Sequence, residues 1–140
     1  MRLSLLLLVF AVLGAVPAAA QPSDAVFTPY DALEWVEIVP GVTFAATHGD
    51  MMAEAHGKLI RFDAGVSTPV HTHTNAYHGV VIQGRVTNPY SDDEALREMG
   101  AGDYWYVPGG APHRTACVSE EPCLFYTYGD AAWDVAVLED

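Results

Sequence analysis

Basic residues are scarce in this sequence. Six lysine and arginine side chains stand against 18 aspartates and glutamates, which gives the 140-residue chain a formal net charge of −12 at pH 7. An acidic surface repels nucleic-acid phosphates and anionic lipid headgroups. The composition therefore excludes a nucleic-acid-binding function. Acidity also keeps a protein soluble, so it identifies no substrate by itself.

Long apolar runs are absent from the sequence after Ala20. Before that point, Arg2 precedes an apolar run that ends in Ala18-Ala19-Ala20, the pattern of a secretory signal peptide. A spanning helix needs about 20 apolar residues, and position 21 is Gln rather than the Cys of a lipoprotein. We predict a signal peptide over residues 1–20, an exported chain (periplasmic or secreted) and no membrane attachment after cleavage. An uncleaved anchor is the alternative.

Cysteine is nearly absent too. Cys117 and Cys123 are the two in the chain, and a turn-like Val-Ser-Glu-Glu-Pro spacer separates them. In an oxidising compartment two such residues form a disulfide across a hairpin. A thiol in the active site is the alternative.

No long helical pattern occurs in the mature chain. Residues 21–34 form a short polar lead, and residues 35–140 are of a length that suits one domain. Within them, short runs rich in β-branched and aromatic residues alternate with Gly, Pro, Asp and Asn, which predicts strands joined by turns. The predicted strands are 35–39, 42–48, 57–64, 69–73, 77–83, 85–88, 103–107, 113–118 and 123–128. The pattern predicts an all-β sandwich or closed barrel, with one helix-permissive stretch at residues 91–99.

Histidines supply the clearest chemistry. His71 and His73 are two positions apart on a predicted strand, so their side chains share one face. The rigid segment Pro108-Gly109-Gly110-Ala111-Pro112 leads directly into His113. Imidazole is a ligand for zinc, iron, nickel and copper, and three such ligands leave positions open for water or substrate.

Two segments around these histidines resemble the motifs of the cupin superfamily. Gly65-x5-His71-x-His73, followed by a strand that ends at Gly84, is similar to the first motif, and Gly102-x5-Pro108-x-Gly110-x2-His113 matches the second. The chain looks like a small exported bacterial cupin of an uncharacterised group. The resemblance implies a double-stranded jelly-roll barrel with a divalent metal ion, namely iron, manganese, nickel or zinc.

The first motif departs from the family pattern. Cupins commonly place a Glu three or four residues after the second histidine, and this chain has no carboxylate there. Counting back six residues from Gly84 puts Tyr77 in that place, whereas counting four forward from His73 puts His78 there. Both cannot be in register, because a shift of one residue turns a side chain to the other face of a strand. Ligand chemistry favours His78 as a fourth metal ligand, and the gap count favours Tyr77.

Other side chains receive weaker assignments. His48 and His56 lie outside both motifs, and we expect them to be exposed to solvent. Tyr126 and Tyr128 share one face of a predicted strand and could line the mouth of the barrel. A phenol near a metal can orient a substrate or donate a proton, which makes Tyr77 and Tyr126 the predicted catalytic side chains.

Two classes of function fit this sequence. The first is a metal-dependent enzyme, most readily a dioxygenase-like oxidoreductase, that acts on a small molecule in the barrel. The second is a non-catalytic exported module that binds a metal or a ligand, which fits the lack of a dedicated acid or base in either motif. A fold kept without a metal site is a third reading, which the three histidines argue against. Small cupins often dimerise, so a homodimer is also expected.

Overall fold

A computed structural model describes residues 27–88 and 98–138. The predicted signal peptide, residues 21–26 of the lead and most of the helix-permissive stretch 91–99 lie outside the described residues. Within them there is a single turn of 3-10 helix, η1, and ten strands. Their bounds are η1 Tyr30–Ala32, β1 Val36–Val39, β2 Val42–His48, β3 His56–Phe62, β4 His71–Thr72, β5 Tyr77–Gln83, β6 Val86–Thr87, β7 Tyr104–Val107, β8 Ala116–Cys117, β9 Cys123–Gly129 and β10 Ala136–Val137.

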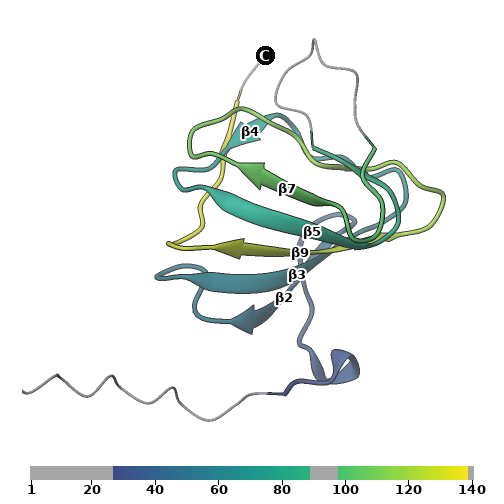
Figure 1. Cartoon of the computed structure of the whole chain (residues 1–140), viewed down its shortest axis with the longest axis horizontal. Helices are drawn as coiled ribbons and strands as arrows, with labels where there is room; N and C mark the ends of the chain where they lie inside the picture. Colours follow the sequence, from purple (N-terminus) through teal and green to yellow (C-terminus); the bar gives the residue numbers. More distant parts are fainter. Residues whose placement is uncertain (1–26, 89–97, 139–140) are drawn as a thin grey trace, which may run out of the picture.

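The larger layer is a six-stranded antiparallel sheet in the order β1-β2-β3-β9-β5-β7. Figure 1 shows its central strands side by side, with β9 between β3 and β5. Along β9 the residues at odd-numbered positions are buried and those between them are half-buried, the alternation expected of a sheet with one face on a core. The same alternation gives β3 an inner face that carries His56, Lys58, Ile60 and Phe62.

The second layer consists of short strand pairs, β4 with β10 and β6 with β8. Isolated bridges join these pairs: Ser67 faces Ala116, and His71 faces His113. The layer therefore runs from β10 through β4 to the segment before β8. It lies opposite the six-stranded sheet and closes the barrel.

Apolar side chains from both layers form the core of the barrel. The core includes Val81, Val86, Val107 and Phe125, each at most 3% exposed. Burial of side chains of this size contributes roughly 1.5–3 kcal/mol each.

The prediction of an all-β jelly-roll barrel is confirmed, and strand positions agree with the predicted ranges to within a few residues. Strand β10 was not predicted.

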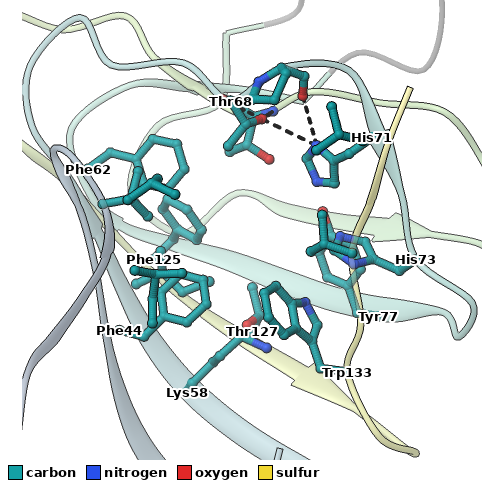
Figure 2. A pocket seen from close by; sticks show the side chains of 18 residues that line it. Phe44, Lys58, Phe62, Thr68, His71, His73, Tyr77, Phe125, Thr127 and Trp133 are labelled. Atoms are coloured by element: carbon teal, nitrogen blue, oxygen red, sulfur yellow. Dashed lines mark hydrogen bonds between the residues drawn. The ribbon is translucent and has the colours of Figure 1, made fainter. Parts of the chain in front are cut away.

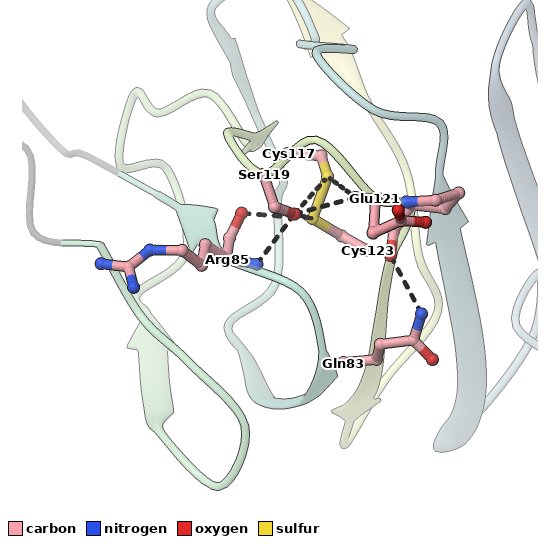
Figure 3. The surroundings of a disulfide bond; sticks show 7 residues. Gln83, Arg85, Cys117, Ser119, Glu121 and Cys123 are labelled. Carbon is pink, nitrogen blue, oxygen red and sulfur yellow. Dashed lines mark hydrogen bonds between the residues drawn. A yellow bond between two sulfur atoms is a disulfide. The ribbon is translucent and has the colours of Figure 1, made fainter.

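A disulfide joins Cys117 on β8 to Cys123 at the start of β9, which confirms that prediction. Figure 3 shows the bond with Ser119 beside it, whose hydroxyl donates to the carbonyl of Glu121 at 2.8 Å. The backbone N–H of Arg85 donates to the same hydroxyl at 3.2 Å. The disulfide thus connects the β6–β8 strand pair to the six-stranded sheet.

No described helix has the length and apolarity needed to cross a membrane.

Candidate functional site

The site centres on three buried histidines from two segments. His71 lies on β4, His73 follows it, and His113 lies at the end of the Pro- and Gly-rich turn; they are 6%, 7% and 1% exposed. Paired backbone hydrogen bonds between His71 and His113, at 2.8 and 2.9 Å, hold the two segments in register. One ring nitrogen from each of the three lies within 4.8 Å of the others. The structure thus brings together the three residues that the motifs indicated.

Backbone carbonyls fix the orientation of each ring. The Nδ1–H of His71 donates to the carbonyl of Pro69 and that of His113 to the carbonyl of Ala111, both at 2.9 Å. The Nδ1–H of His73 donates to the carbonyl of Asp134. A histidine that donates through Nδ1 keeps a lone pair on Nε2, and such outer hydrogen bonds are typical of metal-binding histidines. Three Nε2 lone pairs therefore converge on one place, which fits a metal ion.

Burial favours the neutral rings of His73 and His113 by lowering their pKa values. It lowers the pKa of His73 from 6.5 to about 4, against the opposing effect of the carbonyl of Asp134. Positive charge on His71, His113 or Lys58 lowers the pKa of His73 further. Burial also lowers the pKa of His113. A metal ion binds the neutral form of a histidine ring. The lowered pKa values therefore favour metal binding without release of a proton.

The register of β5 decides between Tyr77 and His78. Tyr77 faces the cluster, and its hydroxyl lies 3.1 Å from Nε2 of His113. His78 is on the opposite face, where its Nδ1 lies 2.6 Å from the hydroxyl of Tyr104 and its ring packs on Tyr106. The expectation of His78 as a fourth ligand is therefore corrected. β5 pairs with β7 in continuous register, and this register places Tyr77 rather than His78 next to the three histidines.

A short chain of hydrogen bonds positions Tyr77. The hydroxyl of Thr115 donates to Oδ1 of Asn88 at 2.8 Å, and Nδ2 of Asn88 lies 3.4 Å from the hydroxyl of Tyr77. Asn88 donates to the phenol oxygen, which lies 3.1 Å from the His113 nitrogen that would bind a metal ion. Tyr77 is therefore held beside the ligand atoms, where it can accept or return a proton.

An apolar cavity of about 340 Å³ opens beside the cluster. Figure 2 shows His71, His73 and Tyr77 on one side and aromatic rings, among them Phe44, on the other. Its volume is within the range of small-molecule sites. Among the described residues that line it, none carries a carboxylate.

The prediction for Tyr126 is also corrected. Phe125 and Thr127, its neighbours on β9, line the cavity, so Tyr126 points to the other face of the sheet. There its hydroxyl lies close to Gly57 on β3. Tyr128 shares that outer face. Alternation along β9 is the physical reason, because adjacent side chains of a strand point in opposite directions.

Sequence reasoning missed Lys58 in the cavity wall and misplaced His56, which lies next to it. Lys58 lines the wall and is 3% exposed, and its Nζ lies 3.0 Å from Nε2 of His56 and 4.7 Å from the ring centre of Trp133. His56 is also 3% exposed, so the expectation that it is exposed is wrong. The period-two pattern could have found both, because they share a strand face with the apolar residues Ile60 and Phe62. Burial lowers the pKa of Lys58 from 10.5 to about 7.

The sequence and fold match known proteins. A family model described as the ChrR cupin-like domain matches residues 23–132. The DNA damage-repair/toleration protein DRT102 of Arabidopsis thaliana is 32% identical over 82 residues, which make up 59% of this chain and 26% of the plant protein. The chain thus spans about a quarter of the length of that relative.

Two solved structures share the fold. An RmlC-like cupin from Shewanella frigidimarina superposes with a TM-score of 0.64 at 21% identity, covering 78% of this chain and 93% of that chain. The polyketide cyclase RemF from Streptomyces resistomycificus superposes with a TM-score of 0.71 at 18% identity, covering 84% and 87%. At such identities the likeness describes the fold and leaves the reaction open.

Proposed function

The chain belongs to the family of ChrR cupin-like domains, and from this premise we propose that it is a metal-dependent enzyme acting on a small molecule in the barrel. In this proposal His71, His73 and His113 bind one divalent metal ion. A single observation carries it: three oriented imidazoles bring one ring nitrogen each within 4.8 Å of one another, and two of these side chains line an apolar cavity. A purely structural role would not need three buried lone pairs facing one another.

The metal would supply a positive charge that polarises a bound substrate oxygen and, with iron, manganese or nickel, a path for electron transfer; zinc would supply the charge alone. The chain supplies the rest. Tyr77 orients the substrate and holds a proton next to His113, and the apolar wall excludes water. Because all three ligands are neutral, the site favours a substrate that coordinates through an anionic oxygen.

We propose oxygen-dependent oxidation of the dioxygenase type as the reaction class. The absence of a carboxylate among the described lining residues supports this choice, because hydrolysis or isomerisation commonly uses a carboxylate as acid or base. The same absence is what favours the second candidate function, a non-catalytic module that binds a metal or a ligand.

Metal content and oxygen uptake test the proposal together. Protein prepared without an affinity tag of histidines is analysed for metals, then incubated with small diols, catechols, flavonols and thiols in an oxygen electrode. We expect one metal ion per chain and substrate-dependent oxygen consumption. Bound metal without turnover would favour the binding module, and a chain that takes up no iron, manganese, nickel or zinc would contradict both.

Two histidine variants give a matched control. His71→Ala should abolish stoichiometric metal binding, whereas His78→Ala should retain it, because His78 lies on the outer face of β5 with Tyr104. Tyr77→Phe should retain the metal and lower turnover. Metal loss in His78→Ala would show that the register assigned to β5 is wrong.

We also propose that the chain is exported, with cleavage after Ala20, and that it pairs as a homodimer. N-terminal sequencing of the protein recovered outside the cytoplasm would test the cleavage, with Gln21 as the expected first residue. Size-exclusion chromatography with light scattering would test the pairing.

A further inference from the structure

The chain has a single lysine, and the fold buries it. Lys58 projects from β3 into the cavity wall, 3% exposed. Among the described residues no carboxylate forms an ion pair with it. A buried ammonium without a counter-ion is costly, and an anion bound beside Lys58 would favour the charged form that burial disfavours.

The neighbours of Lys58 hold the amine without neutralising its charge. Nδ1 of His56 lies 3.1 Å from the carbonyls of Glu54 and Ala131, so this nitrogen carries the hydrogen and Nε2 accepts from Nζ of Lys58 at 3.0 Å. The rings of Trp133 and Phe44 lie 4.7 and 5.6 Å from Nζ, within the range of cation–π contacts. An ammonium has three hydrogens, and one of them is directed to His56.

A second unsatisfied donor lies beside it. Thr127 on β9 is the direct cross-strand partner of Lys58 and is 4% exposed. Its Oγ1 is buried and has no hydrogen-bond partner in the described part of the chain, although the side chain lines the cavity. Figure 2 shows Lys58 and Thr127 next to each other near Trp133, across the cavity from His71.

We infer that Lys58 and Thr127 form an anion subsite that binds the carboxylate of a small carboxylic acid with an apolar body. The inference rests on the proposed function, because it names the class of substrate for the same cavity. The ammonium and the hydroxyl each donate to one carboxylate oxygen. The apolar body fills the space between, and the opposite end of the molecule, which carries the oxygen that would coordinate the metal ion, faces the histidine cluster.

The chemistry of the wall favours one carboxylate over a more highly charged group. Two adjacent donors match the two oxygens of a carboxylate, whereas a phosphate has three oxygens to satisfy and carries up to two charges. Phe44, Ile60 and Trp133, which line the same cavity, offer no carboxylate or hydroxyl group. A sugar would leave many hydroxyl groups without partners there.

Binding of a matched pair of probes tests the subsite. We would measure the dissociation constants of 3-phenylpropanoate and 3-phenylpropanamide at pH 7 by calorimetry. The wild-type protein should bind the carboxylate at least about tenfold more tightly, since hydrogen bonds to charged groups are the stronger kind. Lys58→Met should remove this preference, and Thr127→Val, which changes little in shape, should reduce it by about threefold or more.

Arg61→Met is the matched control. Arg61 lies on the same strand but on its outer face, with its guanidinium 4.5 Å from the ring of Trp35. The variant loses one positive charge, as Lys58→Met does, and should keep the preference for the carboxylate. Equal affinity for the two probes in the wild-type protein, no binding of either, or an unchanged preference in Lys58→Met would overturn the inference.

The same titrations in a chelator separate this inference from the proposed function. If the metal proposal fails, metal-free protein still prefers the carboxylate through Lys58. If the subsite fails, metal-loaded protein keeps its ion and shows no preference that depends on Lys58.

Discussion

Burial of the only lysine predicts an unusual dependence of stability on pH. The pKa of Lys58 is lowered to about 7 in the fold, against 10.5 for a lysine that is open to water in an unfolded chain. Between these values the unfolded chain holds a proton that the folded chain has lost. The contribution of Lys58 to the free energy of unfolding therefore rises with pH in that window. It is lowest below pH 7, where Lys58 is charged in both the folded and the unfolded chain.

The size of the effect follows from the shift. Each pH unit at which the two states differ by one proton is worth about 1.4 kcal/mol. Since Lys58 is half protonated in the fold near pH 7, the gain between pH 7 and pH 9 is about 2 kcal/mol. Urea unfolding of metal-free protein, followed by tryptophan fluorescence at both pH values, gives the free energy of unfolding.

The Lys58→Met variant measures how much Lys58 contributes to the pH dependence of the free energy of unfolding. The variant removes the titrating group, so the increase from pH 7 to pH 9 should be smaller by about 2 kcal/mol than in the wild-type protein. Slopes are compared rather than absolute values, because the variant also removes the hydrogen bond to His56. Equal slopes in the two proteins would refute the argument that Lys58 loses its proton in the folded state near pH 7.

Three further predictions concern the metal site, the disulfide and the sheet. His113→Ala should abolish metal binding, measured by elemental analysis, while the far-ultraviolet circular dichroism spectrum stays that of the wild-type protein. Replacing both cysteines with serine should lower the free energy of unfolding by about 2 kcal/mol, since the bond closes a short loop; an unchanged urea midpoint would contradict this. Gly79→Ala should cost about 1–3 kcal/mol, because a Cβ there would lie 2.1 Å from the ring of Trp105. Gly100→Ala, with nothing within 4 Å, is its control, and an equal loss in both would show that the Trp105 contact is not the cause.

The longer strands could be predicted because each one carries its own pattern. In β2 and β9, runs of apolar, aromatic and β-branched residues stand between turn residues, so the local sequence predicts a strand; in β9 both faces carry large side chains, so the sequence did not determine which face is buried. The three clustered histidines could also be predicted, since their residue types and short spacings specify a site before any tertiary contact is known. In both cases the information lies in short segments of the chain.

The other features of the site could not be predicted, because they depend on pairing between strands that are distant in the sequence. The choice between Tyr77 and His78 depends on how β5 pairs with β7, and the two strands are far apart in the sequence. The carbonyl of Asp134 reaches His73 only because β10 pairs with β4, and neither strand has a pattern long enough to predict that pairing. Lys58 was missed for a different reason. Inner and outer residues alternate along its strand, but lysine is usually exposed, so the pattern was not taken to bury it.

Strand β10 makes the candidate metal site depend on a segment that neither motif contains. The carbonyl of Asp134 orients His73, and Trp133 lines the cavity beside it, whereas all three histidines lie at or before His113. A truncated chain that ends before Trp133 would keep the three imidazoles and lose both contacts. Such a fragment should bind metal ions with the intrinsic preferences of free imidazole rather than with those of an oriented site.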